Sequence, residues 1–164
     1  MAKIRTSIFV ASAIFLAACS SNPFESGSDT VGQSDFAAAS DPSSPAFFNQ
    51  TIGDRVFFEV DQSVLTAEGR ALLSEQANWL ATNADFTAII EGHADEQGTR
   101  EYNLALGARR ASAVQDFLVS RGVAPGRLRT VTFGKERPVS LCSDETCYSQ
   151  NRRSVTVISA GGLS

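Results

Sequence analysis

The alternation of strand-like and helix-like segments is the feature of this sequence that most constrains its fold. Short runs rich in β-branched and aromatic residues alternate with longer segments that have apolar residues at helical spacing. The expected strands are residues 56–60, 87–92, 128–133 and 155–159. One expected helix begins after a cap at Thr66, a longer one covers 99–120, and a short one covers 144–152. This order predicts an α/β fold, a two-layer sandwich in which two main helices cover one four-stranded sheet.

The start of the chain has the pattern of an export signal that ends in a lipidation site. A positively charged start precedes an apolar run over residues 8–16, which is far shorter than the roughly 20 residues of a membrane span. The run ends in Leu16-Ala17-Ala18-Cys19, which resembles the lipobox of bacterial lipoproteins. The resemblance implies removal of residues 1–18, lipidation of Cys19 and, because Ser20 is not an aspartate, transfer to the outer membrane. The alternative is an ordinary signal peptide with a cysteine near its end by chance.

Residues 19–50 are expected to form the lipidated N-terminus and a flexible linker. This segment is rich in Ser, Gly, Pro, Asp and Ala, and its aromatic residues follow no helical or strand period. In an alternative interpretation, Phe47 and Phe48 dock on the domain. The folded domain is expected over residues 51–164, and a length of about 110 residues is near the commonest size of a single domain.

The charge balance argues against several classes of ligand. The chain has 14 Lys and Arg, 18 Asp and Glu and one His, for a net charge of −4. Nonspecific nucleic-acid binding needs a basic surface, so no nucleic-acid partner is expected. The single histidine also weakens a zinc interpretation, and no metal or other cofactor is expected.

Lipidation of Cys19 would leave Cys142 and Cys147 as a pair. Their C-x4-C spacing in an exported chain favours a disulfide, which would stabilise the fold by about 2 kcal/mol through closure of a short loop. A metal site with two cysteine ligands is the alternative, although His93 is the only imidazole in the sequence.

The candidate binding groups lie in and after the loop that follows the second expected strand. Asp95 falls just past the strand end, and the helix after it places Asn103, Leu106 and Arg110 on one stripe at the border of its buried face. Gly107 in the neighbouring apolar stripe is small enough to let the helix lie close to the sheet.

Asp95 and Arg110 could then meet at the rim of one crevice. An acid would take an ammonium group and a guanidinium would hold a carboxylate, so the pair suits a zwitterion. Ligands of open α/β sheets often bind beyond the carboxyl ends of the strands, where this loop falls. The alternative is a structural ion pair between the two side chains.

The stretch from Gly92 to Ala111, with residues 56–61 before it and 133–138 and 151–153 after it, resembles the OmpA-like peptidoglycan-binding domain family. Together with the lipobox and the linker, it resembles the lipoprotein members of that family, which belong to the Tol–Pal system. The resemblance implies an OmpA-like sandwich with a mixed four-stranded sheet, and noncovalent binding of meso-diaminopimelate in the peptide stem of peptidoglycan. Such a protein tethers the outer membrane to the cell wall and supports envelope integrity and constriction at cell division.

By matched position, the resemblance assigns the main ligand contacts to Asp95 and Arg110. It gives supporting contacts to Asp61, Thr99, Asn103 and Leu106, and a role to Arg153. It also implies TolB and TolA as protein partners, so a protein-docking module is a second interpretation.

A cell-wall hydrolase is a third interpretation. Glu96 or Asp95 would act as acid or base with help from His93. The sequence has no nucleophile motif and no set of metal ligands. A noncatalytic protein is therefore expected.

Overall fold

The computed structural model describes residues 40–161. The expected signal peptide, Cys19 and residues 20–39 of the expected linker lie outside this range. The helices are α2 (Pro45–Phe47), the π-helix η1 (Phe48–Gly53), α3 (Ala67–Thr82), α4 (Arg100–Ser120), the 3-10 helix η2 (Pro125–Arg127) and α5 (Glu145–Asn151). The strands are β1 (Arg55–Phe57), β2 (Phe86–His93), β3 (Leu128–Gly134) and β4 (Arg153–Ala160).

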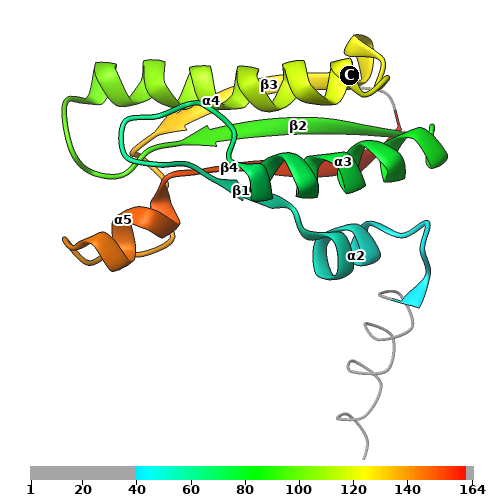
Figure 1. Cartoon of the computed structure of the whole chain (residues 1–164), viewed down its shortest axis with the longest axis horizontal. Coiled ribbons are helices and arrows are strands. Elements are labelled where there is room, and N and C mark those ends of the chain that lie inside the picture. Colours follow the sequence, from blue (N-terminus) through cyan, green and yellow to red (C-terminus); the bar gives the residue numbers. More distant parts are fainter. Residues whose placement is uncertain (1–39, 162–164) are drawn as a thin grey trace, which may run out of the picture.

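The strands form one mixed sheet in the order β1-β4-β2-β3. The β2 and β3 strands are parallel, whereas β4 runs antiparallel to both β1 and β2. Helices α3 and α4 lie on the same side of this sheet (Figure 1) and contact each other. The predicted α/β sandwich with a mixed four-stranded sheet under two main helices is therefore confirmed.

Both main helices begin where the sequence predicts. The Thr66 hydroxyl accepts a hydrogen bond from Gly69 N at 3.0 Å, and the Thr99 hydroxyl accepts one from Tyr102 N at 3.2 Å. These side chains satisfy amide groups that have no partner within the first helical turn.

Helix α4 lies very close to the sheet at Gly107. A Cβ atom at this position would lie 2.5 Å from Thr132 Oγ1 and 2.8 Å from the carbonyl oxygen of Gly92. Only glycine fits such an approach, and the predicted role of this small residue is confirmed.

The first strand is shorter than predicted. It ends at Phe57 instead of residue 60, although Phe58 N still donates to Arg152 O at 2.9 Å. Beyond that bond the chain turns, with Gln62 N donating to Glu59 O at 3.1 Å and Asp61 in the left-handed region at a φ of 55°. The apolar run predicted the strand, but the turn at its end has no glycine or proline to reveal it.

Residues that pack on the domain begin before the expected boundary at residue 51. Phe48 has no exposed surface, and its ring lies 5.0 Å from that of Trp79. The Trp79 indole N–H donates to Pro42 O at 2.7 Å. Burial of an aromatic side chain stabilises by about 2 to 3 kcal/mol, which is enough to dock this segment. The structure thus shows the alternative arrangement, with Phe47 and Phe48 packed on the domain.

No helix within residues 40–161 has the length and apolar character needed to cross a membrane.

Candidate functional site

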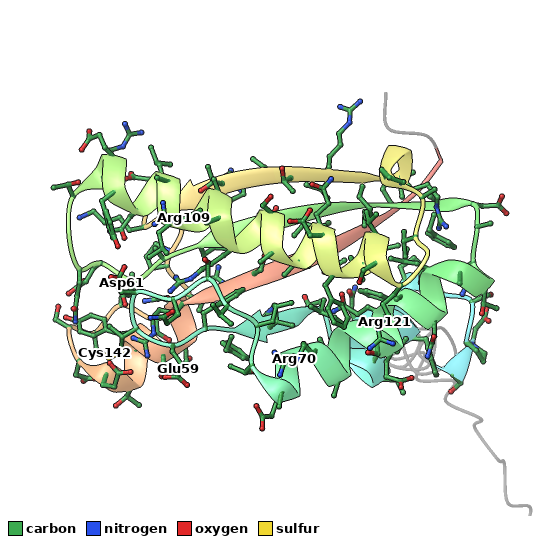
Figure 2. The ribbon with its side chains drawn as sticks, turned by 45° about the horizontal axis from the view of Figure 1, so that its top comes forward. Glu59, Asp61, Arg70, Arg109, Arg121 and Cys142 are labelled. Carbon is green, nitrogen blue, oxygen red and sulfur yellow. A yellow bond between two sulfur atoms is a disulfide. The ribbon has the colours of Figure 1, made fainter. Side chains whose placement is uncertain are left out.

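A pocket of about 240 Å³ opens beyond the carboxyl end of β2, between that strand end, the loop after β1 and the first turns of α4. It is lined by Val60, Asp61, Asp95, Gln97, Gly98, Tyr102, Asn103 and Leu106. Figure 2 shows Glu59 and Asp61, from the loop after β1, at the end of the domain where α4 begins. The structure thus brings together four of the residues predicted for the site: Asp61, Asp95, Asn103 and Leu106.

The loop over residues 94–99 is fixed by side chains on both sides. Asn103 Nδ2 donates to Gln97 O at 2.7 Å, and Lys135 Nζ donates to Gly98 O at 2.7 Å. Gly98 has a φ of 89°, which other residues rarely adopt. Asn103 therefore shapes the pocket as well as lining it, and Lys135 is a supporting residue that the sequence did not reveal.

Asp95 lies in the pocket wall with only 7% of its surface exposed. Its Oδ1 atom accepts a hydrogen bond from Gln97 N at 3.2 Å, and its Oδ2 atom lies 3.3 Å from Arg152 Nη1. Arg152 also donates to Phe58 O at 3.1 Å and pairs with Glu145. The arginine that contacts Asp95 is thus Arg152, which the sequence did not single out for the site.

Arg110 lies behind the pocket and has no exposed surface. Its guanidinium donates to three main-chain carbonyls: Nε to Gln62 O at 2.8 Å, Nη1 to His93 O at 2.9 Å and Nη2 to Glu59 O at 3.2 Å. These bonds hold the loop after β1 against the end of β2. Arg110 therefore fixes the rim that carries Asp61.

The charge of Arg110 has no acidic partner within 4.0 Å among residues 40–161, so the alternative of a structural ion pair with Asp95 is not what the structure shows. Burial lowers the pKa of Arg110 to about 10, and Asp95 acts in the opposite direction. The guanidinium therefore stays protonated at neutral pH. Each of its two terminal nitrogens donates one N–H to a carbonyl and keeps a second N–H, because arginine has five donors.

A second carboxylate lies at the mouth of the pocket. Asp61 Oδ1 accepts a hydrogen bond from the hydroxyl of Tyr102, and this bond raises the pKa of Tyr102. Asp61 has a positive φ, a conformation that costs energy in most residues but that aspartate tolerates better than most. Asp61 and Asp95 make the opening acidic, while the charge of Arg110 lies behind it.

Besides Arg110, two of the predicted residues, Thr99 and Arg153, do not line the pocket. Thr99 acts as the cap of α4. Arg153 is 4% exposed on β4, where Nη2 donates to Arg137 O at 3.2 Å and Nη1 donates to Asn151 O at 3.4 Å. Its Nε has no hydrogen-bond partner in the described part of the chain.

Asp95 lines the pocket, but His93 and Glu96, the other groups named for a hydrolase, lie outside the lining. His93 is 1% exposed, its ring stacks on Phe133 at 5.5 Å, and its pKa is lowered to about 4, first by burial and then by the charges of Arg153 and Arg137. Glu96 is exposed and accepts a hydrogen bond from the Tyr148 hydroxyl at 3.0 Å.

Cys142 and Cys147 are joined by a disulfide. The bond closes the loop before α5, a helix whose first turn is capped by Asp144 and whose Glu145 pairs with Arg152. The disulfide is thus part of the segment that supports the partner of Asp95.

Comparisons with known proteins agree with this fold. Residues 57–152 match the OmpA family. A peptidoglycan-associated lipoprotein of Mesorhizobium japonicum is 50% identical over 147 residues, which cover 90% of this chain and 87% of the relative. A peptidoglycan-associated lipoprotein of Brucella abortus is 53% identical over 126 residues, covering 77% and 75% of the two chains.

Solved structures of related domains have the same fold. The crystal structure of the peptidoglycan-associated lipoprotein from Burkholderia pseudomallei superimposes with a TM-score of 0.66 at 38% identity, over 74% of this chain and 99% of that one. The C-terminal domain of Helicobacter pylori MotB has a TM-score of 0.61 at 19% identity, over 65% of this chain and 84% of that one, and shares the fold. The chain therefore belongs to the OmpA family, and within it to the peptidoglycan-associated lipoproteins.

Proposed function

We propose that this protein is an outer-membrane lipoprotein that binds peptidoglycan without cleaving it, through the zwitterionic end of meso-diaminopimelate in the peptide stem. One observation carries the proposal. A fully buried, protonated Arg110 without an acidic partner in residues 40–161 lies behind a pocket whose wall and mouth hold Asp95 and Asp61.

An unpaired buried cation is costly, because the interior solvates a charge poorly. A ligand carboxylate that reached Arg110 would offset this cost, and the second N–H on each terminal nitrogen offers donors for it. The ammonium group of the same amino-acid end would then face Asp95 and Asp61. A simple anion or a simple amine would satisfy only half of this arrangement, so the site should prefer a zwitterion.

The cellular role rests on the lipobox at Cys19 and on the relatives, which are named peptidoglycan-associated lipoproteins. A lipid anchor at one end and a wall-binding domain at the other would tether the outer membrane to peptidoglycan. We place the protein in the Tol–Pal system, in which it supports envelope integrity and constriction during division.

We further propose that TolB docks over the same pocket and that the protein also communicates with TolA. Val60 and Tyr102 line the pocket and are 52% and 45% exposed, so they offer apolar contact area at its rim. A soluble muropeptide should then compete with TolB for this protein. Simultaneous binding of both at saturation would show that the two surfaces are separate.

The test of wall binding is retention on purified sacculi. We expect Asp95→Asn and Arg110→Met each to weaken binding by about 2 to 5 kcal/mol, which is roughly thirtyfold or more, because each leaves one half of a buried charge contact unpaired. Glu96→Gln and Arg109→Met are the matched controls, since they change exposed neighbours of the same charge, and we expect them to bind like the wild type.

Two further readouts make this test specific. Free meso-diaminopimelate should release the wild-type protein from sacculi at concentrations at which lysine, which has only one amino-acid centre, does not. Circular dichroism identifies the variants that are folded, and folded Asp95→Asn alone decides the test if loss of the three Arg110 hydrogen bonds unfolds Arg110→Met. Wild-type retention of folded Asp95→Asn and Arg110→Met would overturn the assignment of this pocket.

A further inference from the structure

Strand β1 lies at the edge of the sheet, where its only neighbour among the strands of residues 40–161 is β4 (Figure 1). Thr156 N donates to Asp54 O at 2.8 Å and Phe58 N donates to Arg152 O at 2.9 Å, so the main-chain groups of residues 54, 56 and 58 face β4. Because these groups alternate along a strand, the N–H and C=O groups of Arg55 and Phe57 point away from the sheet. Such an edge is a template for another strand.

A groove of about 680 Å³ follows this edge. One wall is the beginning of α3, with Thr66, Gly69 and Leu72, and the other is α5, with Ser149 and Gln150. The floor is β1 with the residues that follow it, and Phe57 is 49% exposed there. The free edge of the sheet therefore opens into a space that an extended peptide could occupy.

The charges around the groove indicate what kind of peptide would fit. Its two arginines are already paired, Arg55 with Asp54 and Arg152 with Asp95 and Glu145. Glu59 and Glu68 also line the groove, are exposed, and form no ion pair within residues 40–161. The charges left without a partner are thus both negative.

We propose that this groove binds an extended segment of a partner protein, which pairs with β1 as a fifth strand and places a lysine or arginine beside Glu68 or Glu59. Main-chain hydrogen bonds to Arg55 and Phe57 would supply the pairing, as in other strand-addition complexes. A β-branched or aromatic residue of the segment would lie across from Phe57. This surface is distinct from the pocket at Asp95 and extends the protein's function to a second class of ligand.

Two other occupants fit the charges less well. Residues 20–39 of the chain itself contain Glu25, Asp29 and Asp35 and no Lys or Arg, so this segment would be repelled. A second copy paired antiparallel through its own β1 would place Glu59 of each copy near the Asp54–Arg55 ion pair of the other, where Arg55 is already paired.

The probe for the test is a capped hexapeptide, Lys-Val-Thr-Val-Lys-Val, titrated into the chain over residues 20–164 and followed by NMR. We expect the largest shifts and slowed hydrogen exchange at the amides of Arg55 and Phe57. In a paired peptide, alternate amides face β1 and the others face away from it. N-methylation of the amides that face β1 should weaken binding about tenfold or more, whereas methylation of the others should change the affinity less than about twofold. Equal effects of the two sets would overturn strand pairing, and this readout does not depend on any change to the protein.

A charge reversal tests the stated partner chemistry. Glu68→Lys should weaken the lysine peptide about fivefold and should favour the matched peptide Glu-Val-Thr-Val-Glu-Val. Asp116→Lys, an exposed acid on α4 outside the groove lining, is the control and should change neither affinity. Tighter binding of the acidic peptide by the wild type, or concentration-dependent dimers in light scattering, would overturn the proposal. Sacculus retention of Glu68→Lys should match the wild type, so this test stands or fails separately from wall binding.

Discussion

Replacement of Arg110 by lysine should destabilise the domain even though it keeps the positive charge. The guanidinium donates from three nitrogens to the carbonyls of Gln62, His93 and Glu59 at 2.8, 2.9 and 3.2 Å. A lysine ammonium is a single nitrogen on a flexible stem and cannot reproduce this fork. If it kept one of these bonds, two carbonyls that now pair with a charged donor would lose it, at about 1.5 to 3 kcal/mol each. The free energy of unfolding should therefore fall by about 3 kcal/mol or more.

The assay is urea unfolding followed by the fluorescence of Trp79, the only tryptophan of the chain. Arg109→Lys is the matched control, because Arg109 is the exposed neighbour on the same helix, and we expect a change within about 0.5 kcal/mol. A loss below about 1 kcal/mol in Arg110→Lys would refute the role of Arg110 in fixing the loop after β1.

Three further predictions concern stability. Gly107→Ala should lower the free energy of unfolding by about 1 to 3 kcal/mol, because the added Cβ would lie 2.5 Å from Thr132 Oγ1. Gly126→Ala is the control and should not lower it, because an added Cβ there would have nothing within 4 Å. Equal effects of the two variants in urea unfolding would contradict the close packing of α4. Burial lowers the pKa of His93 from its ordinary value of 6.5 to about 4 in the fold. Between pH 4 and 6.5 the unfolded state therefore binds more protons than the folded state. The free energy of unfolding should be highest above pH 6.5 and should fall as the pH falls toward 4. The free energy of unfolding should depend less steeply on pH in His93→Gln than in the wild type. An unchanged dependence would show that other groups cause it. Replacement of Cys142 and Cys147 by serine should lower the free energy of unfolding by about 2 kcal/mol. Wild-type stability of this variant in thermal unfolding would show that the disulfide adds little to the stability of the domain.

The parts of the fold set by local sequence could be predicted. The β-branched runs gave all four strands, and the hydroxyls of Thr66 and Thr99 gave the helix starts, because capping depends on residues only three positions apart. Gly107 revealed the close contact of α4 with the sheet. The docking of Phe48 was only an alternative, since an isolated aromatic has no period. The adjacent Ser44 and Pro45, a cap followed by a proline at the first helical position, were the local signal for it.

The site could be predicted as a place but not as a set of contacts. The strand end located Asp95, and helical spacing placed Asn103 and Leu106 beside it. The partner of Asp95 was missed because Arg152 is 57 residues away and its neighbour is also an arginine. Which of two adjacent arginines turns toward the site depends on where β4 begins, and that boundary is set by pairing with β1 rather than by local sequence.

The most direct measurement is a crystal structure of the protein with a muropeptide that contains meso-diaminopimelate. We predict the ligand's amino-acid end in the pocket at Asp95, with its ammonium group at the acidic side chains and its carboxylate turned toward Arg110. Electron density for this group at any other surface, with the pocket empty, would contradict the assignment of the site.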